Sequence, residues 1–267
     1  MTPALGVIGC GNMAYALVKG IVNGDGVRYE NIYVSDVNDT RTDLFNREFG
    51  AKVVSNSGVV AAADITFIAV KPAQVQDVLI TTRDQWQPGK LLVSIAAGIP
   101  TRLIESILGQ KIPVVRVMPN TPCLVAEGVS AVCGGSYASS GQLQLVEGIF
   151  SNLGLAVILE EKYLDAVTAV SGSGPGYAYL VAEAMIDAAV SLGLSQEMAS
   201  ELVINTIRGS MTMLLKTHEH PAVLKAQVTS PGGTTIAGLR QLEENGIRKA
   251  FFAALEKAYE RSVELGQ

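Results

Sequence analysis

Strand-like and helix-like segments alternate along the first 160 residues, and this alternation restricts the fold more than any other feature. Five short runs rich in Val and Ile are apolar almost throughout, as expected for strands buried on both faces: 5–9, 32–36, 65–70, 91–98 and 114–119. Helix-like segments lie between them, at 13–23, 40–49, 73–82 and 101–108, and the pattern continues to about residue 155. The alternation predicts an α/β fold, a doubly wound parallel sheet with right-handed crossovers.

The first strand runs directly into a glycine-rich turn, "GVIGCGNMA", and a helix-like segment follows it. Gly9, Gly11 and Ala14 form a G-x-G-x-x-A pattern, in which the first glycine allows a tight turn and the second lets a pyrophosphate approach the backbone. The helix N-terminus offers free N–H groups and the positive end of a dipole. We therefore predict a Rossmann-type dinucleotide-binding domain over residues 1–160. Its turn contacts are expected from Ile8, Gly9, Cys10, Gly11, Asn12 and Met13; the alternative is a glycine-rich turn without a ligand.

The end of the second strand bears on which dinucleotide is used. Asp36 is placed to accept the ribose hydroxyls, which favours NAD over NADP. No arginine follows it immediately to bind a 2′-phosphate, and Arg41 is the nearest. Polar groups there can still bond a phosphate, so the choice of cofactor stays open. The predicted contacts at this end are Ser35, Asp36 and Asn56, with Asn38 as a further phosphate donor.

The nicotinamide is expected along the carboxyl ends of the later strands, which share one edge of a parallel sheet. The predicted contacts there are Ala69, Val70, Lys71, Pro72, Ala96, Ala97 and Asn120. Lys71 is also a candidate proton donor, although a lysine that leaves a strand is more often solvated or in contact with the cofactor ribose. For Asn120 the alternative is an ordinary turn residue.

Residues 161–267 contain long helical patterns and no convincing strand, which predicts an all-α domain. One helix opens behind Ser173 and carries only two charges, Glu183 and Asp187, which lie four residues apart on one face. A helix that is apolar almost all round must be covered on nearly every side. We predict that a second subunit covers it, so that this is a dimerisation domain; burial within one subunit is the alternative.

The chain lacks the acid–base residue that an alcohol dehydrogenase needs. Its two histidines, His218 and His220, lie in a polar connection and are predicted to form a turn. The β-hydroxyacid dehydrogenases, which have a similar two-domain architecture, carry Lys and Asn on the interdomain helix, where this chain has Ala178 and Val181. A cyclic imine is protonated near neutrality and accepts hydride without a strong acid beside it. The sequence therefore favours imine reduction, in which the protein chiefly orients the substrate.

The segment "QVTSPGGTTIAGL", residues 227–239, places two glycines before two threonines and a helix-like run. Such a segment is either a plain loop that caps a helix or a pocket of N–H groups and hydroxyls that holds an anion. From the residues alone the two interpretations are about equally supported.

Together, "GCGNMA", "AVKP", "RVMPNTP", "SGSGP" and "QVTSPGGTTIAGL" resemble the Δ1-pyrroline-5-carboxylate reductase family, and the resemblance covers essentially the whole chain. It implies NAD(P)H-dependent reduction of pyrroline-5-carboxylate to L-proline, the last step of proline biosynthesis. NADPH is the expected cofactor and NADH the alternative. It also implies an interlocked homodimer, which in this family can assemble into a decamer of five dimers, and a site at the subunit boundary.

The resemblance also implies roles for particular residues. The substrate carboxylate is expected to bind Ser230, Gly233, Thr234 and Thr235, with Thr235 also near the ring nitrogen as the catalytic residue. Glu161 matches an acid near the substrate and Gln227 an amide that touches the cofactor, although each is equally readable as an exposed polar residue. Two positions depart from the family: Gly176 replaces a more common alanine, and "SDVN" lacks the arginine of many bacterial members, which puts NADP preference in doubt.

Composition excludes other classes. A net charge of -5 without a basic run argues against nucleic acid, and no apolar run is long enough to span a membrane. Three cysteines without metal-ligand spacing predict reduced thiols, no metal site and a cytoplasmic location. The alternatives to the implied function are a related imine or ketone reductase of the same fold and a non-catalytic dinucleotide-binding sensor.

Overall fold

The computed structural model describes residues 3–24 and 31–266. The chain forms two compact units: Met1–Ser173 together with Ala258–Gln267, and Gly174–Lys257. Among the described residues, no helix combines the length and the apolarity needed to cross a membrane.

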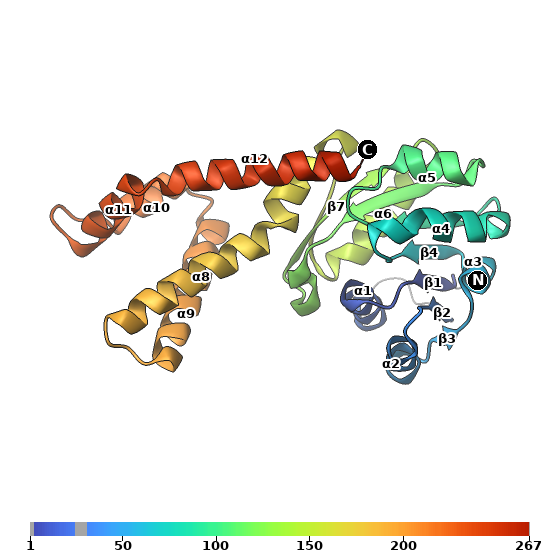
Figure 1. The fold of residues 1–267 in the computed structure, drawn as a ribbon, viewed down its shortest axis with the longest axis horizontal. Coiled ribbons are helices and arrows are strands. Elements are labelled where there is room, and N and C mark those ends of the chain that lie inside the picture. The colour runs from blue at the N-terminus through green and yellow to red at the C-terminus, as the bar shows by residue number, and fades with distance from the viewer. Residues whose placement is uncertain (1–2, 25–30, 267) are drawn as a thin grey trace. The chain divides into compact units, whose positions relative to one another are not determined.

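In the first unit, eight strands of the described chain form one sheet in the order β3-β2-β1-β4-β5-β6-β7-β8 (Figure 1). The strands are β1 (Leu5–Ile8), β2 (Ile32–Ser35), β3 (Lys52–Val53), β4 (Ile65–Ile68), β5 (Leu91–Ser94), β6 (Val114–Met118), β7 (Gly128–Gly134) and β8 (Gly154–Ile158). The helices are α1 (Asn12–Asn23), α2 (Asp39–Phe49), α3 (Asn56–Ala62), α4 (Pro72–Thr82), α5 (Thr101–Leu108), α6 (Ser140–Ser151) and the short α7 (Leu164–Val167), with the 3-10 turns η1 (Arg83–Gln85), η2 (Thr121–Val125) and η3 (Glu161–Tyr163) and the π-helical turn η4 (Thr168–Gly172).

Helices cover both faces of this sheet, which explains why its strands are apolar without alternation. Successive residues of β1 enter different cores: Val7 packs with α1, α2 and α6, and Ile8 packs with α3, α4 and α5. Figure 1 shows α4 and α5 on one side of the strands and α1 and α2 on the other. The predicted α/β fold is confirmed.

One strand of this mostly parallel sheet runs in the opposite direction. β7 pairs antiparallel with β6, whereas the other neighbouring strands are parallel. The connection between β6 and β7, residues 119–127, holds only the 3-10 turn η2. A parallel crossover needs about a dozen residues or more, so this short connection can only reverse the chain direction.

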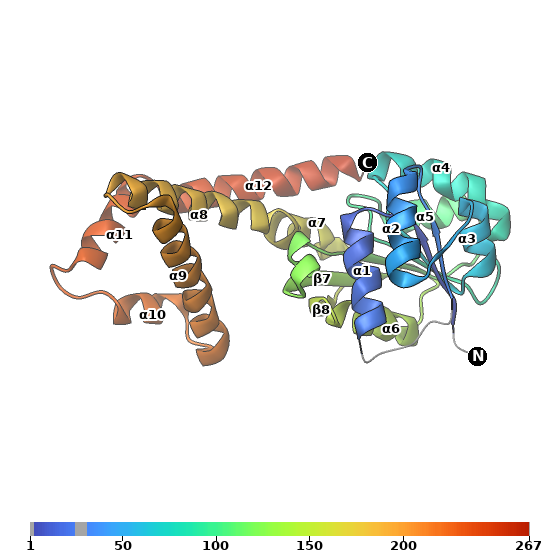
Figure 2. The same ribbon diagram turned by 90° about the horizontal axis from the view of Figure 1, so that it is seen from below.

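The second unit is entirely helical. It contains α8 (Gly174–Ser191), α9 (Gln196–Thr217), α10 (Pro221–Gln227), α11 (Thr234–Glu244) and the first part of α12 (Ile247–Leu265). α8 and α9 are in contact, and Figure 2 shows α9 leaving the end of α8 at a wide angle. Ser195 caps α9 by accepting the Met198 N–H at 3.2 Å. No residue of α8 is buried. Several of its apolar side chains face solvent in the single chain; Tyr179 and Leu180, for example, are each 64% exposed.

The boundary between the units differs from the predicted division at residues 160 and 161. Residues 161–173 belong to the first unit because Leu164 packs against Ala131 and Cys133 of the sheet. The end of α12 joins the same unit, where the Ser262 hydroxyl donates to the Asp165 carboxylate at 2.7 Å. Packing on the sheet thus defines the compact units, and the predicted division into domains 1–160 and 161–267 stays a prediction.

Candidate functional site

The turn between β1 and α1 has the geometry that its glycines predict. Gly9 has φ +97°, and a Cβ there would lie 2.7 Å from the carbonyl carbon of Ala69. Gly11 is the N-cap of α1, nothing lies within 4 Å of a Cβ built on it, and no side chain caps the helix. The first N–H groups of α1 are therefore free to receive an anion.

This turn opens onto a cavity of about 680 Å³ at the carboxyl ends of β1, β2 and β4. The cavity gathers nine of the residues predicted from the sequence: Ile8, Gly9, Gly11, Ser35, Asp36, Asn56, Ala69, Val70 and Lys71. In an open α/β sheet, ligands bind at this edge of the strands. A cavity of this size, lined by a glycine turn and several polar groups, suits an extended phosphorylated ligand.

Five lining residues were not among the predicted contacts: Val37, Asn38, Ser55, Gln74 and Val78, although Asn38 had been noted as a phosphate donor. Two of them are helix N-caps. Asn38 accepts the Thr40 N–H at 3.0 Å, and Ser55 accepts the Gly58 N–H at 3.1 Å. A search for Asn or Ser immediately before the helices that follow β2 and β3 would have found both.

Asp36 has a different set of partners from the one its position suggested. One carboxylate oxygen accepts the Cys10 N–H at 2.6 Å, and the other accepts the Asn38 N–H at 2.8 Å. The side chain thus braces the glycine turn and the start of α2. Contact with a ribose stays a prediction, and would use lone pairs beyond these two bonds.

Eight predicted cofactor contacts do not line this cavity: Cys10, Asn12, Met13, Pro72, Ala96, Ala97, Asn120 and Gln227. Asn120 is 7% exposed and makes one hydrogen bond at each end of its amide. Its oxygen accepts the Val129 N–H at 2.9 Å, and its nitrogen donates to the Ser171 carbonyl at 3.0 Å. Through these two hydrogen bonds Asn120 links β7 to the π-helical turn η4.

Glu161 lies in a network with a buried arginine. Its oxygens accept the Thr101 N–H at 2.8 Å, the Thr101 hydroxyl at 2.6 Å and Nη1 of Arg116 at 3.0 Å. Arg116 is 4% exposed, and its Nη2 has no hydrogen-bond partner among the described residues. The acid predicted to lie near the substrate thus caps the start of α5 and compensates a buried charge.

The thiols of Cys10 and Cys133 resist ionisation. Burial raises the pKa of each from 9.0 to about 12, and the carboxylates of Asp36 and Glu161 respectively add to the rise. At neutral pH both thiols are protonated and poor nucleophiles.

These raised pKa values predict lower stability in alkali. Above pH 9.0 the unfolded chain loses thiol protons that the folded chain keeps until about pH 12, so the free energy of unfolding falls as pH rises through this window. Thermal unfolding of the wild type should therefore show a falling Tm above pH 9. The Tm of the Cys10→Ala/Cys133→Ala variant should fall less steeply with pH. Equal slopes of Tm against pH for the variant and the wild type would contradict the prediction.

In the second unit, the predicted substrate loop forms the N-terminus of α11. Thr234 and Thr235 are its first two residues, Gly233 is its N-cap, and no side chain caps it. The Gly233 N–H donates to the Ser230 carbonyl at 3.0 Å, and a Cβ at Gly233 would collide with the Ser230 hydroxyl. The loop therefore presents free helix N–H groups beside three hydroxyls. The two histidines fill turn roles, as predicted: His218 is the left-handed C-cap of α9, and His220 is the N-cap of α10.

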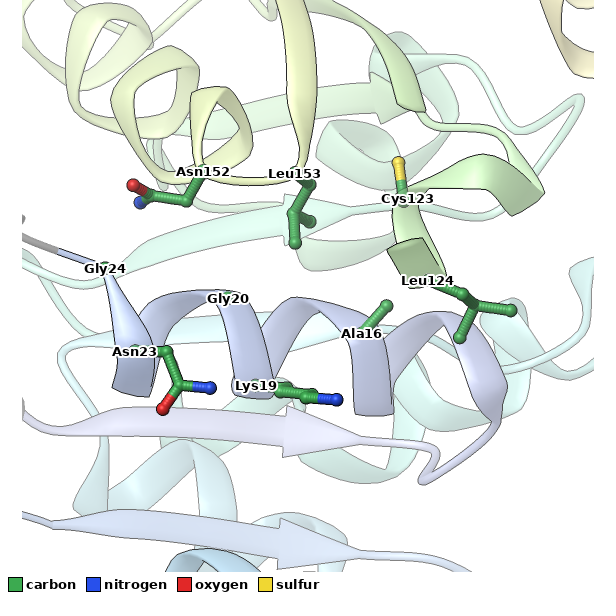
Figure 3. Close-up of a pocket in the computed structure, with 9 residues that line it drawn as sticks. All are labelled: Ala16, Lys19, Gly20, Asn23, Gly24, Cys123, Leu124, Asn152 and Leu153. Atoms are coloured by element: carbon green, nitrogen blue, oxygen red, sulfur yellow. The ribbon is translucent and has the colours of Figure 1, made fainter. Parts of the chain in front are cut away.

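Two further cavities contain almost none of the predicted residues. One, of about 350 Å³ within the second unit, is mainly apolar, and Gln227 lies at its wall. The other, of about 310 Å³, lies along α1 and carries Lys19, Asn23 and Asn152 (Figure 3). Among the described residues, no group of three or more His, Cys, Asp or Glu side chains is placed to hold a metal ion.

Comparison with known proteins identifies similar sequences and folds. Residues 161–265 match the family "Pyrroline-5-carboxylate reductase dimerisation", and residues 4–98 match "NADP oxidoreductase coenzyme F420-dependent". The chain is 42% identical to pyrroline-5-carboxylate reductase of Methanosarcina acetivorans and 41% identical to that of Pseudomonas aeruginosa. The alignments cover 98% of both chains in the first case, and 100% of this chain and 98% of the relative in the second.

Solved structures agree with these matches. The pyrroline carboxylate reductase of Plasmodium falciparum with NADP bound has a TM-score of 0.90 at 36% identity, covering 99% of this chain and 98% of that one. The pyrroline-5-carboxylate reductase of Coxiella burnetii gives the same TM-score and identity over 100% of both chains.

Proposed function

The chain belongs to the pyrroline-5-carboxylate reductase family, and from this we propose how its residues carry out the reaction. It is an oxidoreductase that reduces Δ1-pyrroline-5-carboxylate to L-proline, with NADPH as its cofactor. The observation that carries this function is the similarity to these reductases over the whole length of the chain.

The cavity of the first unit fits a dinucleotide. The uncapped N–H groups at the start of α1 suit a pyrophosphate, and Ser35, Asn38, Ser55 and Asn56 supply polar groups for the adenosine end. We propose Ala69 to Pro72, with Ala96, Ala97 and Asn120, for the nicotinamide side, and Gln227 as a contact from the helical unit. When bound, NADPH supplies the hydride; the protein contributes binding and orientation.

The N-terminus of α11 fits the substrate carboxylate. Its first N–H groups have no side-chain cap, so an anion can replace the missing acceptor. We assign Ser230, Gly233, Thr234 and Thr235 to this carboxylate, and the Thr235 hydroxyl to the ring nitrogen, where it orients the protonated imine. We also propose Glu161 as an acid near the substrate; its carboxylate accepts two hydrogen bonds from Thr101.

Residues 161–265 match a dimerisation family, and we propose a homodimer, with assembly into a decamer as a further step. The exposed apolar side chains of α8 support the dimer, since they need a cover. We also propose a cytoplasmic location, which the three free cysteines support.

Replacing Thr235 by alanine tests the reaction and the carboxylate site together. Loss of a hydrogen bond to a charged group costs about 1.5–3 kcal/mol, which corresponds to about a 10- to 100-fold drop in kcat/KM. Oxidation of NADPH is followed at about 340 nm with pyrroline-5-carboxylate, and NADH is assayed in parallel.

Thr229→Ala is the matched control, because the Thr229 hydroxyl already donates to the Lys225 carbonyl at 2.7 Å. It should keep near wild-type activity, and both variants should bind NADPH normally. Equal activity of Thr235→Ala and wild type would remove the assigned role of Thr235. A wild type that binds NADPH without oxidising it would instead favour a dinucleotide sensor.

A further inference from the structure

We propose that Arg41 is a positioning residue for the dinucleotide, which acts by holding the backbone of the glycine turn in its binding shape. Its Nε donates to the Cys10 carbonyl at 2.6 Å. From the other side, the Asp36 carboxylate accepts the Cys10 N–H at 2.6 Å. Two oppositely charged side chains thus hold the two peptide groups that flank Cys10. This inference rests on the dinucleotide-binding role proposed above.

The bond from Arg41 fixes more than one carbonyl. In a trans peptide the C=O and the N–H point in opposite directions, so the Cys10 carbonyl and the Gly11 N–H are set together. Gly11 is the N-cap of α1 and lines the cavity of about 680 Å³. Arg41 therefore controls the direction of the backbone at the point where the phosphate-binding N–H groups begin.

The surroundings of Arg41 indicate a functional demand rather than a stabilising one. Its Nη2 is buried and has no hydrogen-bond partner among the described residues. A buried N–H without an acceptor is destabilising, whereas a solvated arginine would avoid this. The Arg41 side chain nevertheless lies against the turn, where its Nε donates a hydrogen bond to the Cys10 carbonyl.

Arg41 differs from an arginine that binds the 2′-phosphate of NADPH. It is not among the residues that line the cavity, while Ser35, Asn38 and Asn56 are. A residue that acts through the shape of the turn serves the pyrophosphate, which NADPH and NADH share. Loss of Arg41 should therefore weaken the binding of NADPH and of NADH by the same factor.

The test measures the dissociation constants of NADPH and NADH by titration calorimetry for wild type, Arg41→Met and Arg41→Lys. Arg41→Met should weaken the binding of both cofactors by about tenfold, the lower end of the loss seen when a residue that orients a metal ligand is removed. The KM for NADPH should rise by the same factor, while kcat at saturating NADPH stays unchanged. Arg41→Lys keeps a donor for the carbonyl and should recover part of the affinity.

Arg47→Met is the control on the same helix, since the Arg47 side chain is 73% exposed and its Nη2 lies 3.9 Å from the Glu48 carboxylate. It should bind both cofactors as the wild type does. A much larger loss for NADPH than for NADH would make Arg41 a 2′-phosphate ligand and overturn the proposal, as would unchanged affinity in Arg41→Met. If Arg41→Met does not fold, affinities for NADPH and NADH that fall by the same factor in Arg41→Lys support the proposal, whereas unchanged affinities or a loss confined to NADPH overturn it. A wild type that binds neither cofactor would contradict the proposed function itself.

Discussion

Replacing Gly9 by alanine is expected to remove measurable NADPH binding and to destabilise the first unit. Gly9 has φ +97°, where an L-residue is strained by about 1–3 kcal/mol, and its new Cβ would lie 2.7 Å from both the carbon and the oxygen of the Ala69 carbonyl. Backbone atoms cannot move aside as a side-chain end can, and overpacking adds about 1–3 kcal/mol. We expect the free energy of unfolding, measured in urea, to fall by about 3 kcal/mol or more. The calorimetric signal for NADPH binding should also be lost.

Two other glycines separate strain from ligand contact. Nothing lies within 4 Å of a Cβ built on Gly11 or on Gly148. The Gly11→Ala variant should be as stable as the wild type but should bind NADPH more weakly, because the new Cβ would lie where the pyrophosphate approaches. Gly148→Ala, within α6, should bind normally and gain up to about 1 kcal/mol of stability. If Gly9→Ala unfolded at the same urea concentration as the wild type, the backbone conformation at Gly9 would not limit which residue the turn accepts, and the prediction would be wrong.

Replacing Glu161 by alanine should be nearly as damaging. It would leave the guanidinium of Arg116, 4% exposed, without its carboxylate. Breaking a buried ion pair costs about 3–5 kcal/mol, and the partial exposure of Glu161 reduces this to about 2–4 kcal/mol. Thr101 would also lose the acceptor for its N–H and its hydroxyl. The free energy of unfolding in urea measures the effect.

A double variant identifies the cause of this loss. Arg116→Met/Glu161→Leu removes both charges, and an apolar pair of similar volume often restores stability. It should therefore be more stable than Glu161→Ala, although it still lacks the bonds to Thr101. If Glu161→Ala were as stable as wild type and only raised the KM for pyrroline-5-carboxylate, Glu161 would be a direct substrate contact and not a brace.

The sequence predicted the parts of the fold that repeat a pattern. The strands of the sheet centre and the helices between them were located to within a few residues, because continuous apolar runs and helical periodicity are local signals. β3 and α3 were missed, since two and seven residues are too short to show a period. The reversed β7 was missed because strand direction depends on the length of a connection and not on the composition of the strand.

Within the site, the glycine turn was predictable and the partners of its neighbours were not. Gly9 was recognised by a backbone demand that only glycine meets. Asp36, Asn120 and Glu161 were each predicted to face a ligand, which stays a prediction; their hydrogen bonds to the protein's own groups were not foreseen. A polar residue at a strand end has several possible partners, and only the folded chain decides among them. Arg41 was noticed only as the nearest arginine, since its bond to Cys10 spans residues far apart in sequence.

If the proposed homodimer forms through α8, the stability of the helical unit should depend on protein concentration. No residue of this apolar helix is buried in the single chain, so a second chain would add to its stabilisation, and folding of the unit and association would then follow one mass-action equilibrium. In that case dilution would lower the stability of the unit, and assembly of the dimer would be the last step of its folding.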